Sequence, residues 1–244
     1  MKISLITISF NSASTILNTL KSVKNQHFKD FEHFLIDSDS KDETLKIAKK
    51  FSDMTKIFSE PDNGIYHAFN KGIKKSTGEI IGFLNSDDTF FDSTSLNIIS
   101  ESFDENTDCV FGDLIYTNKN EKIKRIWKSA EFKPGDFKKG WMPAHPTFYC
   151  RRSIYEKLGM YDEDFKIAGD YELMLRFLEK NRIRSKYVNH TLVNMKVGGI
   201  SNKTIKSKID ILKEEFRAFR KNNIELNKTL YIYHKLKKIK EFKI

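Results

Sequence analysis

Cysteine, proline and glycine are scarce in this chain of 244 residues. It has 2 Cys, 4 Pro and 11 Gly, too few for a disulfide framework or a long disordered linker. Cys109 and Cys150 form no Cys-x-x-Cys pair, so we expect two buried thiols in a reducing compartment and no zinc site.

Long hydrophobic runs are also missing. No apolar stretch approaches the roughly 20 residues that cross a bilayer. The apolar opening at residues 3–10 follows a single lysine and has no small-residue cleavage site, so it predicts a first buried strand and not a signal peptide. We therefore expect a cytoplasmic protein.

Positive charge is present in excess but is unevenly spread. Residues 203–244 hold 13 Lys and Arg against 5 Asp and Glu, so they carry +8 of the formal net charge of +10. Nucleic acid is one partner that suits such a segment, and an anionic membrane surface suits it at least as well. We expect the membrane surface and no nucleic acid.

Strand-like and helix-like segments alternate through the first half of the chain. Apolar runs predict strands, and apolar residues at helical spacing predict helices. The expected strands are 3–10, 32–37, 56–59 and 79–84, and the expected helices are 14–25, 44–51 and 65–75. This βαβ order predicts an α/β fold, with a mostly parallel sheet flanked by helices and ligands at the carboxyl ends of the strands.

The second half of the chain is less regular. We expect a hairpin of strands 109–116 and 123–128, an extended segment at 142–150 and a helix at 170–180. Beyond residue 203, apolar residues recur at helical spacing in two sets, which are Ile209, Leu212, Phe216 and Phe219, then Ile232, Leu236, Ile239 and Phe242. The sequence thus predicts one domain over 1–202 and a basic helical extension over 203–244.

Two acidic clusters follow expected strands. Asn85-Ser86-Asp87-Asp88 comes after residues 80–84, and a second cluster fills residues 37–42. Carboxylates at a strand end suit a divalent cation such as Mg²⁺ or Mn²⁺ together with phosphate oxygens, but the same residue types also form solvated turns. In the second cluster Asp37 suits a ribose or base, while Ser40 or Asp42 suits a helix cap.

The order of four motifs resembles the family 2 glycosyltransferases with a GT-A fold. These motifs are IDSDSKDET at 36–44, SEPDNGIYHAFNKG at 59–72, NSDD at 85–88, and a block from AHPT at 144–147 through Gly159 to GDYEL at 169–173. The resemblance covers residues 1–200 and fits enzymes of bacterial surface-polysaccharide synthesis. It implies a nucleotide-sugar half at 1–100 and an acceptor half at 101–202.

The resemblance also implies a role for individual residues. Asp170 would be the catalytic base, and Asp87 the ligand of Mn²⁺ or Mg²⁺. Donor binding would fall to Asp37, Asp62, Asn63, Gly64, Asn70, Lys71 and Asp88. His145, Trp141 and Arg151 would lie on the acceptor or diphosphate side. For Asp170 itself, a helix N-cap is the competing interpretation.

The chain departs from the family pattern at several positions. Asn85 replaces the first acid of the Asp-x-Asp motif, Gly169 replaces the acid before the base, Ser38-Asp39 replaces Asp-Gly, and His67 stands where an acid is common. The only glutamine is Gln26, so the Gln-x-x-Arg-Trp motif of processive synthases is missing. The resemblance therefore implies the addition of single sugars.

The function implied is inverting transfer of one sugar from a nucleoside-diphosphate donor, with UDP favoured, to a hydroxyl of a glycan or lipid-linked saccharide. General-base catalysis of such a step contributes about 10²–10⁴-fold. Three alternatives stay open: a sugar nucleotidyltransferase, a glycoside hydrolase, and a non-enzymatic basic adaptor. The Gly198-Gly199 pair suits either a lid over the donor or a plain turn. The basic helix at 231–244 suits the inner face of the membrane, a solvated surface or a homodimer contact.

Overall fold

The structure is a computed structural model that describes residues 1–118, 120–197 and 205–241. The glycine pair at 198–199, predicted as a lid or a turn, and Phe242 lie outside these residues. Among the side chains of helix α8, those of residues 238–241, and so Ile239, are also outside the description. No helix in the described part of the chain is long and apolar enough to cross a membrane.

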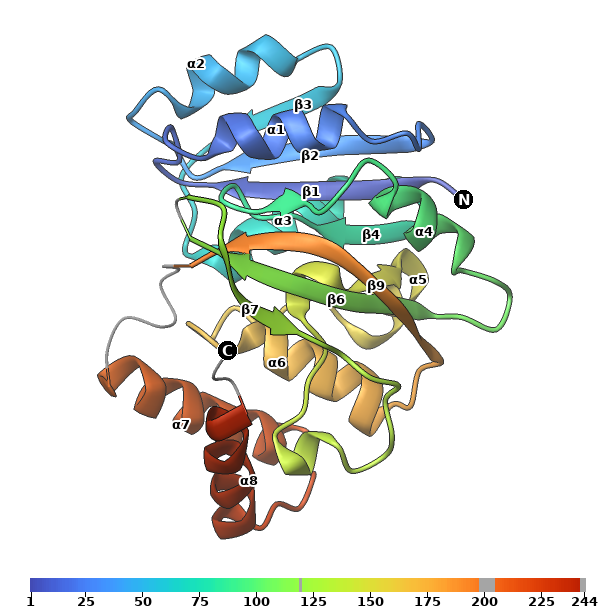
Figure 1. Ribbon diagram of the computed structural model, residues 1–244, viewed down its shortest axis with the longest axis vertical. Helices are drawn as coiled ribbons and strands as arrows, with labels where there is room; N and C mark the ends of the chain where they lie inside the picture. The colour runs from blue at the N-terminus through green and yellow to red at the C-terminus, as the bar shows by residue number, and fades with distance from the viewer. Residues whose placement is uncertain (119, 198–204, 242–244) are drawn as a thin grey trace.

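The first half forms the parallel part of the sheet, as the alternating pattern predicts. The strands β1 (Ile3–Ser9), β2 (Phe31–Asp37), β3 (Thr55–Ser59) and β4 (Ile80–Phe83) pair in parallel in the order β3-β2-β1-β4. They are connected by α1 (Ile16–Lys24), α2 (Thr44–Ala48) with the 3₁₀ turn Lys49–Phe51, and α3 (Ile65–Lys75). The carboxyl ends of these strands point to one edge of the molecule (Figure 1).

The second half adds antiparallel pairs, so the sheet of the predicted α/β fold is mixed and not purely parallel. Its elements are β5 (Thr89–Phe90), α4 (Ser95–Glu101), β6 (Cys109–Thr117), β7 (Ile123–Trp127), β8 (Tyr149–Arg151), α5 (Arg152–Leu158), α6 (Gly169–Met174) with the π-helical turn Leu175–Lys180, and β9 (Ser185–Lys196). Strand β8 runs antiparallel to β4 and β6, while β9 is parallel to β6 and antiparallel to β5. The predicted hairpin of β6 and β7 is confirmed.

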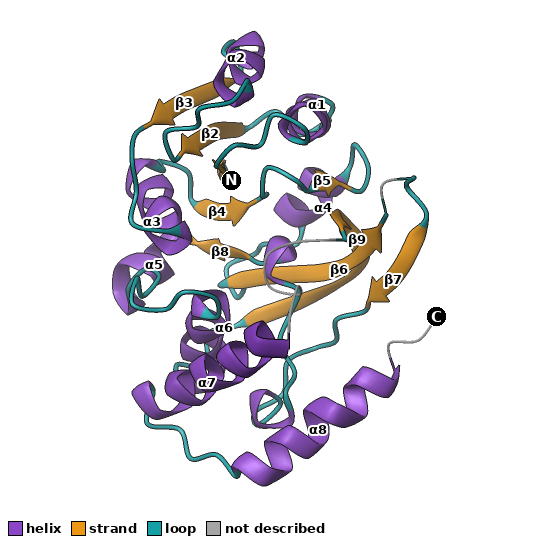
Figure 2. Ribbon diagram, turned by 90° about the vertical axis from the view of Figure 1, so that its left-hand side faces the viewer, coloured by secondary structure: helices purple, strands orange, loops and turns teal. Residues whose placement is uncertain are grey.

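Helices cover both faces of this sheet (Figure 2). On one face α3, α5 and α6 enclose a core rich in aromatic rings, and on the other α1 and α4 enclose a second core. The apolar residues of α3 fall on one side because Tyr66, Phe69 and Ile73 recur at helical spacing. Cys109 and Cys150 are buried free thiols, as predicted, and lie opposite each other on β6 and β8.

The basic C-terminal segment is part of this domain and not a separate extension. Helices α7 (Ile205–Lys221) and α8 (Lys228–Glu241) lie beside α6 (Figure 1). Ala218, Phe219 and Tyr231 are buried in the same core as α3 and α6. Leu212 and Phe216 pack against that core as expected, whereas Ile209 is 49% exposed. The boundary at 202/203 therefore marks a change of composition and not of fold.

Candidate active site

The loops that follow β1, β2 and β4 meet at the carboxyl edge of the sheet, as predicted from their order. The amide of Asn11 donates to Ser40 Oγ (2.9 Å), and the Lys41 amide donates to Asn11 Oδ1 (2.9 Å). The hydroxyls of Ser12 and Ser86 are hydrogen-bonded at 2.8 Å. Asn11 and Asp39 have φ angles of 47° and 58°, a conformation uncommon outside glycine that is often found at functional sites.

Asp37 lies at the centre of this edge but is enclosed. Its side chain is completely buried and accepts hydrogen bonds from the hydroxyls of Ser9 (2.7 Å), Ser40 (2.5 Å) and Ser59 (2.8 Å) and from the Ser40 amide. The structure does not present Asp37 to a ligand, in contrast to the direct nucleoside contact expected from the resemblance. The carboxylate instead ties together the ends of β1, β2 and β3.

Asp62, at the start of α3, faces the same edge. Its carboxylate accepts hydrogen bonds from the Ser38 hydroxyl and from the Gly64 amide (2.9 Å). Gly64 has a φ of 121°, which favours glycine, and it lies exposed beside Asn63. Lys71 points back from α3 to the carbonyl of Pro61 (2.9 Å). The turn before α3 is thus held from both sides, with exposed backbone at its tip.

The Asn85-to-Asp88 cluster follows β4 and contains two orphaned acceptors. Asp88 is completely buried, and within the described residues neither its Oδ1 nor Asn85 Oδ1 has a hydrogen-bond partner. Its Oδ2 accepts a long hydrogen bond of 3.3 Å from Asn85, and a backbone hydrogen bond from Lys196 on β9 gives the carboxylate some further compensation. Burial, and then the charge of Asp87, raise the pKa of Asp88 well above its usual value, and burial also raises that of Asp87. Asp88 is therefore a poorly compensated buried carboxylate beside the half-buried Asp87, and the cluster is not a fully solvated turn.

Asp170 is half-buried in the first turn of α6, and the N-cap residue of that helix is Ala168. The N-cap interpretation of Asp170 is therefore wrong. The Tyr66 hydroxyl, from α3, accepts a hydrogen bond from the Gly169 amide (2.7 Å). Burial lowers the pKa of His145, and the Asp170 carboxylate partly opposes that shift, so Asp170 lies within electrostatic reach of His145. His145 is hydrogen-bonded to the Tyr161 hydroxyl at 3.0 Å.

Three of the predicted site residues are placed differently. Asn70 is buried, and its side chain bonds the backbone of Tyr161 in both directions (2.9 and 3.0 Å), which joins α3 to the acceptor half. Arg151 is paired with Ile80 at the amino end of β4 and donates to the carbonyl of Thr107. It therefore lies at the opposite end of the strands from the site. Trp141 packs among aromatic rings of the core, namely Phe111, Phe132 and Phe137.

Tyr116 lies within electrostatic reach of the candidate site and has Arg125 against its ring, and neither residue was predicted from the sequence. Burial raises the pKa of Tyr116, Arg125 lowers it, and Asp88 and Asp170 each raise it further. Tyr116 therefore lies within electrostatic reach of both acids, and the Arg125 guanidinium lies 5.2 Å from its ring centre. The signal available in the sequence was Arg125 on an expected strand with Tyr116 and Trp127 as aromatic partners. The same pattern is equally typical of a hairpin without a functional role.

The donor set around Asp88 fits a hard divalent cation. Asp87, Asp88 and Asn85 offer oxygen atoms, two of which are buried and unpartnered, and oxygen is the ligand type that Mn²⁺ and Mg²⁺ prefer. In the described part of the chain no group of three or more His, Cys, Asp or Glu side chains is arranged to hold a metal by itself. A cation here would need ligands in addition to these side chains, and phosphate oxygens are of the type that Mn²⁺ and Mg²⁺ prefer.

A mixed sheet flanked by helices, with acids from β4 and α6 facing one edge, defines the GT-A class of glycosyltransferases. The Glycosyl transferase family 2 model matches residues 4–170, and the chain belongs to this family. A PGL/p-HBAD biosynthesis glycosyltransferase from Mycobacterium bovis is 28% identical over 207 residues, which cover 82% of this chain and 78% of the relative. An uncharacterized glycosyltransferase from Mycobacterium tuberculosis is 30% identical over 187 residues, 71% and 68% of the two chains.

Solved structures share the fold. Residues 1–349 of TarS from S. aureus, in complex with UDP-GlcNAc, superpose with a TM-score of 0.70 at 18% identity, covering 94% of this chain and 69% of TarS. The mannosyltransferase PcManGT from Pyrobaculum calidifontis, in complex with GDP-Man and Mn²⁺, superposes with a TM-score of 0.65 at 18% identity, covering 90% and 63%. These similarities confirm the α/β GT-A fold that the motifs predicted.

Proposed function

We propose that the protein transfers one sugar, with inversion, from a nucleoside-diphosphate donor to a hydroxyl of a glycan or lipid-linked saccharide in cell-surface polysaccharide synthesis. The observation that carries this proposal is the buried Asp88 carboxylate, whose Oδ1 has no partner among the described residues, in a chain that matches the Glycosyl transferase family 2 model. Asp88 comes from the donor half and Asp170 from the acceptor half, and both lie within electrostatic reach of Tyr116, so we place the reacting sugar between them. UDP is the favoured nucleotide, because TarS of the same fold binds UDP-GlcNAc.

In this proposal Ser38 and Asp62 line the nucleoside side, with the exposed tip at Asn63 and Gly64 next to them. Asp87 and Asp88 would hold Mn²⁺ or Mg²⁺, whose chemistry is to neutralise charge on a diphosphate leaving group. Arg125 and Lys71 add positive charge near this region. Asp37 acts by keeping the loops around the nucleoside in place.

Asp170 is the proposed general base. It is half-buried beside neutral His145, and the Tyr66 hydroxyl holds the backbone just before it. It takes the proton from the acceptor hydroxyl as that oxygen attacks the anomeric carbon on the face opposite the diphosphate. A carboxylate at this position serves inversion in a single displacement, with a contribution of about 10²–10⁴-fold to the rate.

The test combines a binding screen with one variant. Nucleotide sugars are titrated onto the protein with Mn²⁺ or with EDTA, and transfer is followed by release of the nucleoside diphosphate. We expect Asp170→Asn to bind the donor as the wild type does and to lose about 10²-fold or more in kcat. Turnover by Asp170→Asn equal to that of the wild type would refute the base assignment, and the lack of metal-dependent binding of any donor would refute the proposed function.

We further propose that α8 brings the enzyme to an anionic membrane on its cytoplasmic side. Its side chains Leu230, Tyr233 and Leu236 are 50–60% exposed, and Lys237 lies beside them on the same helix. Exposed apolar side chains next to cations suit the lipid headgroup region. A lipid-linked acceptor would give this contact a purpose.

A further inference from the structure

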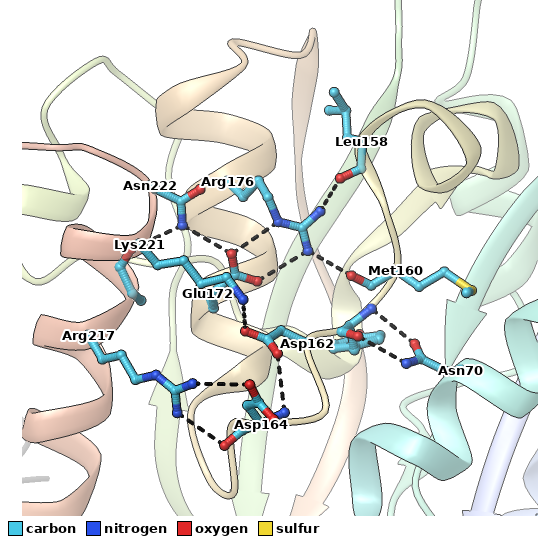
Figure 3. Close-up of polar contacts among 12 residues, drawn as sticks. Asn70, Leu158, Met160, Asp162, Asp164, Glu172, Arg176, Arg217, Lys221 and Asn222 are labelled. Atoms are coloured by element: carbon cyan, nitrogen blue, oxygen red, sulfur yellow. Dashed lines mark hydrogen bonds and ion pairs between the residues drawn. The ribbon is translucent and has the colours of Figure 1, made fainter.

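Helix α7 is bound to the loop that leads into Asp170. Figure 3 shows Lys221 paired with Asp162, and Arg217 with Asp164, across this contact. Asn222, which follows α7, donates to Glu172 on α6 at 3.0 Å. The basic helix therefore uses part of its charge on Asp162 and Asp164 of its own domain and not on an external anion.

The strongest of these contacts is made by Glu214, one turn from Arg217 on α7. Its carboxylate accepts three backbone hydrogen bonds, from the amides of Lys166 (2.9 Å), Ile167 (2.9 Å) and Ala168 (2.7 Å). These amides lie in the loop before α6, and only that of Ala168 belongs to the helix end, where Ala168 is the N-cap residue. A carboxylate close to a helix N-terminus also interacts favourably with the helix dipole. Glu214 thus holds the loop directly before α6 from another helix.

The next amide in the chain is held from the other side. The Gly169 N–H donates to the Tyr66 hydroxyl of α3 at 2.7 Å. Four successive amides, from residue 166 to residue 169, are therefore fixed by two side chains, and Asp170 follows directly. The backbone directly before Asp170 is thus held by α7 on one side and by α3, in the donor half, on the other.

We propose that Glu214 is a positioning residue for the catalytic base, and that α7 thereby completes the active site. This inference rests on the proposed function, in which Asp170 is the base. Glutamine at position 214 cannot replace the carboxylate, because its NH₂ group would face one of the amide donors. The backbone before Asp170 would then shift, and misplacement of a catalytic group by about 1 Å can cost as much as 10²-fold in rate.

The test uses full-length Glu214→Gln with the nucleotide sugar that the wild type turns over. We expect kcat to fall about tenfold to a hundredfold while the Kd of the donor stays within twofold, because the donor half is untouched. The matched control is Glu225→Gln, since Glu225 is exposed and makes no hydrogen bond or ion pair with the described residues. Activities are compared below the Tm of every variant. A kcat of Glu214→Gln equal to that of the control would overturn the inference.

A double variant separates positioning from general loss of structure. If Glu214 acts through Asp170, adding Glu214→Gln to Asp170→Asn lowers the residual rate no further. An additional tenfold loss in the double variant would show an effect outside Asp170 and would also overturn the inference. Failure of the proposed function is distinct, because then Asp170→Asn by itself retains the wild-type rate.

Discussion

The substitution Asp88→Asn should stabilise the protein while it removes activity. Asp88 is completely buried, has an unpartnered Oδ1, and lies next to a second acid, Asp87. Burying a charge without compensation destabilises the folded state, and an amide of the same shape removes the charge. We expect the free energy of unfolding at pH 7 to rise by about 1–3 kcal/mol, the usual cost of an unsatisfied buried group.

The pH dependence gives the same prediction with a definite sign. The pKa of Asp88 is raised in the folded state above its ordinary value of 3.8, so the folded protein binds a proton at a higher pH than the unfolded chain does. The loss of stability caused by the buried Asp88 charge is fully present above the pKa of Asp88 in the folded protein. It becomes smaller as the pH falls through that pKa, because the carboxyl group is then protonated. The advantage of Asp88→Asn over the wild type should therefore shrink between pH 7 and pH 4.

Glu32 provides the control, because it is a buried acid with good partners. Burial by itself raises the pKa of Glu32, but hydrogen bonds from Ser4 and Thr77 and the nearby Lys56 outweigh this and lower it from 4.5 to about 2. Its stabilisation is present above pH 4.5 and is lost as the pH falls toward 2. Glu32→Gln should cost up to about 3 kcal/mol at pH 7, the opposite sign to Asp88→Asn.

The measurement is urea unfolding of the wild type, Asp88→Asn and Glu32→Gln at several pH values, without metal or nucleotide. A lower stability of Asp88→Asn than of the wild type at pH 7 would mean that the folded protein compensates the Asp88 charge, and the prediction would fail. A stability difference that is independent of pH would equally refute the argument from its raised pKa.

Two further predictions concern packing and the membrane. Gly82→Ala should lower the free energy of unfolding by about 1–3 kcal/mol, because a Cβ at Gly82 would lie 1.9 Å from the Tyr149 ring; urea unfolding checks this, and an unchanged midpoint would contradict it. Leu236→Glu on α8 should lose binding to vesicles of anionic lipid in a flotation assay, whereas Glu225→Gln should retain it. Equal flotation of the two variants would count against contact through α8.

The spacing of apolar residues predicted a helix or strand correctly where that element buries one face against elements that are near it in the sequence. Helix α3 spans residues 65–75, as its apolar spacing predicts, and β1, β2 and β4 lie within a residue or two of their expected bounds. Strand β9 was missed, because only Leu192 and Val193 of its twelve residues are buried and polar residues conceal the alternation. Helices α4 and α5 were missed too, being only seven residues each.

The candidate site shows the same division. Motif order located the acids after β4 and at the start of α6, because each lies directly beside a recognisable strand or helix. No pattern in the chain indicated that Tyr116 lies near both acids, since this depends on the pairing of β6 with β9 and on the hairpin with β7. Burial of Asn70 against Tyr161 likewise depends on contacts between residues about ninety positions apart.

The sequence by itself therefore determined the βαβ half, the family and the identity of the acids, because these depend on periodicity and on residue types at short spacing. Only the tertiary structure decided which acids are available. In the structure Asp37 is enclosed by three serines, and Asp88 is buried with an unpartnered oxygen. Arg151 lies at the amino end of β4, away from the carboxyl ends of the strands where the site is found. The tertiary structure also showed that the basic C-terminal segment contains α7, and that Glu214 of this helix holds the backbone before Asp170. These environments depend on contacts between residues that are far apart in the sequence, and charge composition does not indicate such contacts.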